Sequence, residues 1–222
     1  HYLYSDTALE LFSTRPRPYH VYFMLREPAS RVYSSFQYTK NNKGAMKWDI
    51  SFSRMLDLMM NDRCDEVRDC FVYESSFYSM KNEIKWSCYV NYIKKWLDQL
   101  GSDRVHIILM EDFIRNPYRI LSEIASHLNL DGELFKNDSS RKDNATWEIR
   151  NKFLHRFIVS AVRMMPHGSW RKVPERLYYK LQGKKAERSE ADKEAILRLR
   201  EHYVPYNSEL ERLCGLDLSA WR

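Results

Sequence analysis

The sequence lacks long apolar runs and has few of the residues that build metal or disulfide frameworks. No stretch approaches the roughly eighteen consecutive apolar residues of a membrane-spanning helix, and no signal peptide is visible at His1. Four cysteines occur, at positions 64, 70, 88 and 214, and their spacing is not that of a zinc site. The chain begins without methionine, so we expect a longer protein, in which any membrane anchor lies upstream.

The composition is that of a folded domain with a moderately basic surface. A chain of 222 residues with 44% hydrophobic content fits one large α/β domain or at most two small ones. Lys and Arg exceed Asp and Glu by 36 to 30, which gives a net charge of +6. That balance suits an anionic cofactor, an acidic polymer or nucleic acid. Because the charges are interleaved by sign and no nucleic-acid-binding motif is present, we expect no nucleic-acid partner.

The most informative stretch is the junction of a strand and a helix near the N-terminus. Residues 21–25 are apolar, with β-branched and aromatic members, which predicts a buried strand. Arg26 follows the strand, Pro28 suits the first turn of a helix, and Ser34 lies two turns inside it. A guanidinium and a hydroxyl are therefore expected in the crevice beyond the strand, where a phosphate could be held. The alternative is that Arg26 pairs with a surface acid.

A second buried strand is predicted at residues 104–110, and the rhythm of strands and helices indicates a parallel sheet covered by helices. The Phe and Met stripe of residues 51–60 indicates core packing. Gly183 interrupts a basic stretch near the C-terminus. Helices are predicted at 6–12, 28–38, 51–60, 84–100, 117–127, 193–203 and 207–213, and loops at 41–44, 71–85 and 130–148.

Four segments resemble sulfotransferases that use 3′-phosphoadenosine 5′-phosphosulfate (PAPS). The pattern Arg-x-Pro-x-x-Arg-x-x-Ser from Arg26 to Ser34 resembles the family's 3′-phosphate-binding motif. Residues 88–97, 108–130 and 199–221 resemble its Tyr/Trp helix, its strand followed by "E-D-L…P", and its C-terminal "Y-x-P-x-N" segment. The resemblance implies a three-layer α/β fold like that of the P-loop kinases, with a central parallel sheet flanked by helices and one domain over residues 1–222.

The resemblance also assigns residues to the cofactor. Arg26 and Ser34 would hold the 3′-phosphate, and Arg31 would either face the same crevice or pair with Glu27. Gly183, Lys184 and Lys185 resemble the glycine-and-basic loop with which the family closes over the same phosphate. The alternative interpretation of these three residues is an exposed charge cluster. Glu111 and Asp112 are expected to anchor the turn between strand and helix rather than to bind a metal.

The activity implied is transfer of a sulfuryl group from PAPS to a hydroxyl of a carbohydrate or glycosaminoglycan acceptor, with 3′-phosphoadenosine 5′-phosphate (PAP) as product and no metal. His1 stands where some members keep a catalytic histidine, which would remove the proton of the acceptor hydroxyl. The alternative is an incidental terminal residue, with the base upstream. Tyr2 and Tyr4 are then candidates to line the acceptor groove.

One family feature is missing from the sequence. None of the six glycines follows a buried strand in a Gly-Lys-Ser/Thr pattern, so the loop that cradles the 5′-phosphosulfate is not found. We therefore expect this chain to be the C-terminal two-thirds of a sulfotransferase domain, with the loop on upstream residues. The alternative is a non-catalytic nucleotide- or glycan-binding module that has kept the fold.

Within the family, residues 2–6, the Leu-Arg-Glu-Pro variant and the cysteine-bounded loop most resemble Golgi carbohydrate sulfotransferases that act on chondroitin. Two glycosylation sequons, at Asn137 and Asn144, also suggest a secretory compartment and a glycoprotein. Cys64 and Cys70 bracket a short charged loop and are candidates for a disulfide. The Golgi lumen is the compartment expected from these features, and the cytoplasm is the alternative.

Overall fold

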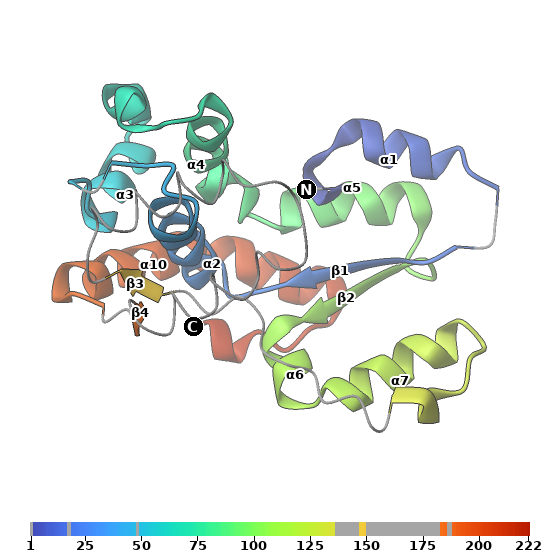
Figure 1. The fold of residues 1–222 in the computed structure, drawn as a ribbon. Coiled ribbons are helices and arrows are strands. Elements are labelled where there is room, and N and C mark those ends of the chain that lie inside the picture. Colours follow the sequence, from blue (N-terminus) through green and yellow to red (C-terminus); the bar gives the residue numbers. More distant parts are fainter. Residues whose placement is uncertain (1, 17–18, 48, 136–146, 150–182, 186–187) are drawn as a thin grey trace, which may run out of the picture. The chain divides into compact units, whose positions relative to one another are not determined.

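The computed structural model describes residues 2–16, 19–47, 49–135, 147–149, 183–185 and 188–222 (Figure 1). None of its described helices is long and apolar enough to cross a membrane. In chain order, the helices, 3-10 and π turns, and strands are η1 Tyr2–Tyr4, α1 Asp6–Ser13, β1 Val21–Leu25, α2 Pro28–Gln37, η2 Tyr38–Asn42, α3 Phe52–Met60, η3 Cys64–Cys70, α4 Glu74–Trp86, α5 Val90–Leu100, β2 Val105–Leu109, α6 Met110–Arg115, α7 Pro117–His127, η4 Gly132–Phe135, β3 Trp147–Ile149, β4 Gly183–Lys185, α10 Glu190–Cys214 and η6 Ser219–Trp221.

The chain divides into two compact units. The first, called the sheet unit here, comprises His1–Arg31, Lys85–Asp143 and Leu199–Arg222. The second, called the helical unit, comprises Val32–Ile84 and Asn144–Arg198. Helices α2, α4 and α10 contribute residues to both units.

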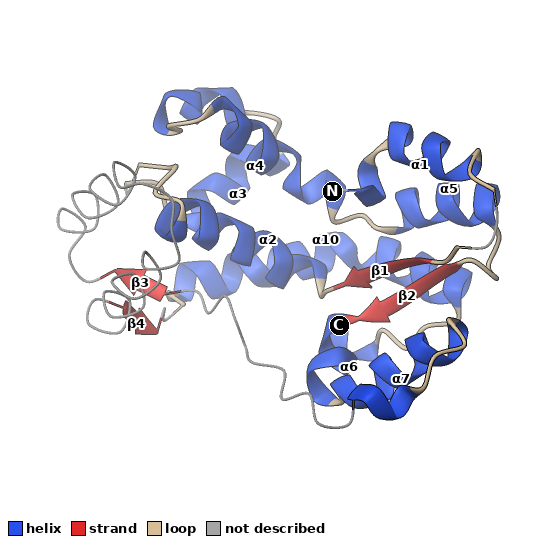
Figure 2. Cartoon of the chain, turned by 45° about the vertical axis from the view of Figure 1, so that its right-hand side comes forward, coloured by secondary structure: helices blue, strands red, loops and turns tan. Residues whose placement is uncertain are grey.

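The sheet unit contains the two strands that the sequence predicts. β1 and β2 pair in parallel, in a register that runs from Val21 opposite Val105 to Leu25 opposite Leu109. Helices α1 and α5 lie on one side of the strands and α7 lies on the other (Figures 1 and 2). This small parallel sheet with helices on both sides confirms the α/β class, and the strands end together at one edge.

The core of the sheet unit lies between β1 and helices α1 and α5. Trp96 is one of its two tryptophans and is almost fully buried. Its indole packs edge-on against Phe23 with ring centroids 5.0 Å apart, and its Nε1 donates to the carbonyl of Leu3 at 3.0 Å. Ile93 and Leu100 lie on the same face of α5, as the helical spacing predicts. The core therefore fixes the N-terminal segment against α5.

Helix starts follow local capping chemistry. α7 begins at Pro117, and the side chain of Asn116 accepts from the backbone N–H of Arg119 at 3.1 Å. Its bounds match the predicted helix. Ser5 and Ser51 cap α1 and α3 through the same kind of side-chain acceptor.

The helical unit has a core built on α3. Phe52, Met55 and Leu56 are buried, which confirms that the Phe and Met stripe is packing. The loop predicted at 41–44 is confirmed only at Lys43 and Gly44, because the chain leaves α2 through the π-helical turn η2, which ends at Asn42. Cys64 and Cys70 are free cysteines at the two ends of η3, so the suggested disulfide is not found.

The helix predicted at 84–100 is confirmed over 90–100 but is interrupted at residues 87–89, and the loop predicted at 71–85 is wrong from Glu74 onward. Helix α4 occupies most of that loop and ends at Trp86, and α5 starts at Val90. The intervening Ser87, Cys88 and Tyr89 are all buried. Three consecutive residues of a helix point in directions about 100° apart, so a partly exposed helix cannot bury all of them. Breaking the helix allows this burial.

The two closing helices predicted at 193–203 and 207–213 form a single helix, α10, with Pro205 inside it. Pro205 lies on the exposed side. Leu199, Tyr203 and Leu210 are buried on the other side, at helical spacing across the proline. Packing of this continuous stripe outweighs the local cost of the missing N–H.

Candidate anion-binding cleft

A cleft of about 490 Å³ lies in the sheet unit, beside β1 and its carboxyl end. Arg26, which directly follows β1, lies in its wall together with Arg31 on α2. Tyr2 and Tyr4 from the N-terminal turn and Tyr89 line the same cleft. The structure thus brings together the predicted cofactor residue Arg26 and the predicted acceptor residues Tyr2 and Tyr4.

The charge of this cleft is of one sign. Its lining contains two arginines and no aspartate or glutamate. Within the described part of the chain, no carboxylate lies within ion-pair distance of the partly buried Arg26 guanidinium. The alternative that Arg26 pairs with a surface acid is therefore not found. A planar guanidinium without an ionic partner suits a phosphate or a similar anion.

Arg31 is held by polar and aromatic groups in the same unit. Its Nη1 donates to Ser87 Oγ at 2.5 Å, and its guanidinium lies 5.5 Å from the centre of the Tyr4 ring. Tyr4 stacks in turn on Trp86, with ring centroids 5.3 Å apart. The cation–π contact fixes both the arginine and the tyrosine at the cleft.

The turn from β1 to α2 is fixed by carboxylates, as expected for Glu111. Glu111 Oε1 accepts from the backbone N–H of Glu27 at 3.0 Å. Glu27 is buried and its carboxylate accepts from the backbone N–H groups of Ala29 and Ser30 at 3.0 and 2.8 Å. These bonds cap the N-terminus of α2. Arg200 lies with its Nε 3.7 Å from Glu27 Oε1 and balances this charge.

The other predicted site residues are placed as follows. Ser34 lies on α2, in the part that belongs to the helical unit. Gly183, Lys184 and Lys185 form strand β4, which pairs antiparallel with β3. His1 lies outside the described residues. The roles given to these residues stay predictions.

A histidine cluster in the sheet unit was not predicted. His20 Nδ1 and His106 Nε2 are 2.8 Å apart, and the ring of His106 stacks on that of His127 with centroids 4.6 Å apart. The Tyr22 hydroxyl lies 3.1 Å from His127 Nδ1. Burial is the main reason why the pKa of His106 is lower than usual, and the two neighbouring imidazoles lower it further. The alternation of side chains along the two strands places Tyr22 and His106 on one face of the sheet, which the sequence could have indicated. His127 from α7 joins them only through tertiary packing, which the sequence does not show.

This cluster borders a second cavity of about 530 Å³, between β2 and α7. Asp98, Glu123 and Cys214 also line it. No group of three or more His, Cys, Asp or Glu in the described residues is arranged to hold a metal ion. The cluster is a set of mutually contacting rings.

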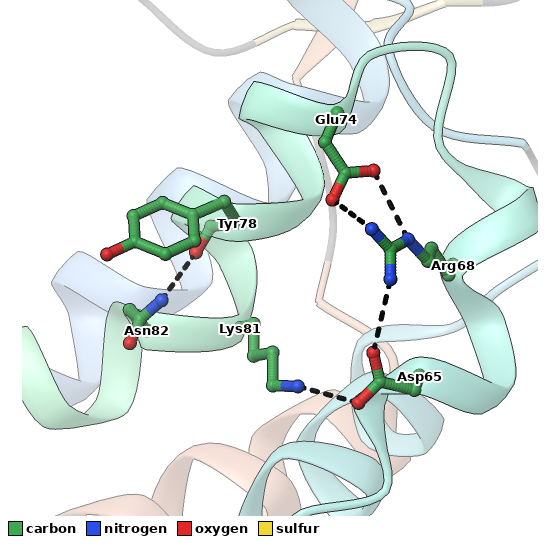
Figure 3. A network of polar contacts seen from close by, with 6 residues as sticks. All are labelled: Asp65, Arg68, Glu74, Tyr78, Lys81 and Asn82. Atoms are coloured by element: carbon green, nitrogen blue, oxygen red, sulfur yellow. Dashed lines mark hydrogen bonds and ion pairs between the residues drawn. The ribbon is translucent and has the colours of Figure 1, made fainter.

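The helical unit carries a network of ionic contacts on its surface (Figure 3). Arg68 forms a two-pronged contact with Glu74, at 2.5 and 3.2 Å, and lies 3.9 Å from Asp65. Lys81 donates to the other oxygen of Asp65 at 2.6 Å. The two cations and two carboxylates balance one another and are largely solvated, so the network leaves no net charge for a ligand.

Comparison with known proteins gives two matches. A family profile described as the sulfotransferase domain matches residues 15–171 of this chain. The crystal structure of a sulfotransferase from Alicyclobacillus acidocaldarius is similar in fold, with a TM-score of 0.56 and 19% sequence identity. The alignment covers 100% of this chain and 64% of that chain, so this chain spans less than two-thirds of the bacterial protein. No curated protein matches the sequence significantly.

Proposed function

Since this chain belongs to the sulfotransferase domain family, we propose that it binds PAPS and takes part in transfer of the sulfuryl group to a hydroxyl acceptor. The family assignment confirms the resemblance to sulfotransferases, and the resemblance to Golgi carbohydrate enzymes stays a prediction. Members of this family typically use PAPS, which supplies the sulfuryl group. The proposal for this chain rests on the cleft beside β1.

One observation carries the proposal. The guanidinium of Arg26 has no ionic partner among the described residues, and it lines a cleft that contains a second arginine and no carboxylate. Such a cleft fits the phosphate groups of a nucleotide, because the charged side chains that line it are both arginines. Arg26 would bind the 3′-phosphate, and Tyr2 and Tyr4 would contact the acceptor.

The finer proposal concerns the acceptor and the compartment. We propose a carbohydrate or glycosaminoglycan hydroxyl, since aromatic rings and basic groups line the cleft together. Tyr2 is 74% exposed, so its ring is accessible to an acceptor that approaches from solvent. The Golgi lumen is proposed from the two sequons, which lie outside the described residues.

Transfer of sulfur-35 from labelled PAPS tests the proposal. The acceptors are desulfated chondroitin, a neutral oligosaccharide and a hydroxyl-bearing peptide. In a longer chain that includes the upstream loop, we expect label in the chondroitin, loss of that label in Arg26→Ala, and normal labelling in Arg115→Ala. Arg115 is a suitable control because its side chain is 74% exposed and pairs with Asp112. If PAP binds but the longer chain labels no acceptor, the result supports the non-catalytic binding module.

A further inference from the structure

The peptide unit between Arg26 and Glu27 is held from both sides. Its carbonyl oxygen, which belongs to Arg26, accepts a hydrogen bond from the Tyr89 hydroxyl at 3.0 Å. Its N–H, which belongs to Glu27, donates to Glu111 Oε1 at 3.0 Å. The two anchors come from separate places in the chain, since Tyr89 precedes α5 and Glu111 lies in α6. Rotation of this peptide plane would break both bonds.

The orientation of this plane sets the direction in which Arg26 leaves the backbone. The plane fixes ψ of Arg26 and φ of Glu27, which are the soft dihedrals on either side of it. Beyond it, the Glu27 carboxylate ties the chain to the first turn of α2. The Arg26 guanidinium has no ionic partner among the described residues that could hold it in place. Its position therefore depends on the backbone more than that of a paired arginine would.

Both anchoring side chains are themselves fixed. Tyr89 is 3% exposed, and its ring lies beside that of Trp221 with centroids 6.1 Å apart. Glu111 uses one oxygen for the Glu27 N–H, and its Oε2 is buried without a hydrogen-bond partner in the described structure. An unsatisfied buried oxygen is costly. The neighbouring Asp112 differs, because it pairs with Arg115 at the surface.

We propose that Tyr89 and Glu111 are positioning residues for Arg26 and act through this peptide unit. The inference rests on the proposed function, in which Arg26 binds the 3′-phosphate of the nucleotide. The experiment is calorimetric titration with PAP and with adenosine 5′-phosphate (AMP), which lacks the 3′-phosphate. The variants are Tyr89→Phe, Glu111→Ala, Glu111→Gln and Arg26→Ala. Tyr78→Phe and Asp112→Asn are the matched surface controls.

We expect Tyr89→Phe and Glu111→Ala each to lower the ratio of PAP affinity to AMP affinity about tenfold, the loss that one hydrogen bond corresponds to. Glu111→Gln keeps a carbonyl oxygen that can accept the Glu27 N–H, so its ratio should stay within about twofold of the unmodified chain. The surface controls should leave the ratio unchanged. A merely structural role would weaken the binding of both nucleotides together and leave the ratio of their affinities unchanged.

The outcomes separate the two proposals. If Arg26→Ala abolishes the preference for PAP while Tyr89→Phe and Glu111→Ala keep it, the positioning role is wrong and the proposed site stands. If Arg26→Ala leaves the preference unchanged, the 3′-phosphate site is wrong and the positioning role fails with it. Should Glu111→Ala fail to fold, Tyr89→Phe decides the question, because it keeps the buried ring and removes only the hydroxyl.

Discussion

Replacing Trp96 by phenylalanine should destabilise the sheet unit through one hydrogen bond and a small cavity. The indole N–H donates to the Leu3 carbonyl at 3.0 Å in a site where Trp96 is only 1% exposed. Leaving that carbonyl without a donor costs about 1–3 kcal/mol. The smaller ring leaves unfilled volume, which adds about 1 kcal/mol. We therefore expect the free energy of unfolding to fall by about 2–4 kcal/mol.

Urea unfolding followed by circular dichroism measures this change, and Ile93→Val is the control. Ile93 is fully buried on the same helix, and its substitution removes one methylene without a polar group, at a cost of about 0.5–1.5 kcal/mol. Trp96→Phe should also speed amide hydrogen exchange in η1, because Leu3 is the middle residue of that turn. A loss for Trp96→Phe no larger than for Ile93→Val would refute the reasoning.

Three further predictions concern pH, capping and thiols. Burial and the neighbouring imidazoles lower the pKa of His106 in the folded chain below the value of about 6.5 that it has in the unfolded chain. The unfolded chain therefore binds a proton at His106 more readily than the folded chain does. The stability that this difference supplies above pH 6.5 should be lost as the pH falls below about 6.5. The urea midpoint should depend less on pH in His106→Gln than in the unmodified chain. An unchanged dependence on pH would show that His106 is not the group responsible. Glu27→Ala removes the α2 cap and the partner of Arg200, and should lower the unfolding free energy by about 2 kcal/mol in urea titrations; a neutral result would show that the cap is not needed. All four cysteines should react with a thiol reagent in urea without prior reduction, whereas Cys88, whose burial raises its pKa to about 11, should stay unreactive in the folded chain; two reactive thiols in urea would indicate a disulfide.

Local chemistry made parts of the fold predictable from the sequence. The run from Val21 to Leu25 is apolar and ends at a polar Arg26 and a proline, so both the strand and the start of α2 follow from it. Pro117 after Asn116 likewise gives the start of α7 directly. In these places propensity, capping and burial favour the same structure, so no long-range information is needed.

Other parts depend on contacts between distant residues. The break between α4 and α5 arises because Tyr89 and Ser87 are drawn inward to Arg26 and Arg31, neither of which is near them in sequence. The sequence pattern alone favoured one helix there. Similarly, Pro205 predicted a helix end, but tertiary packing of the buried stripe keeps α10 continuous.

Some residues of the candidate cleft could be named from the sequence, and the roles given to them stay predictions. Arg26, Tyr2 and Tyr4 were named from the sequence, and the structure places all three around one cleft. The structural role of Glu111 was also expected, and its bond to the Glu27 N–H agrees with it. Nothing in the sequence indicated that Tyr89 holds the peptide unit after Arg26, since its hydroxyl donates to a backbone carbonyl rather than to the side chain of a motif residue.

Calorimetric titration of this 222-residue chain with PAP and, in parallel, with AMP tests the role of Arg26 in binding the 3′-phosphate. We expect PAP to bind and AMP to bind much more weakly, because the 3′-phosphate supplies the anion for Arg26. Equal affinity for the two nucleotides would show that the arginine beside β1 has no part in recognising the 3′-phosphate.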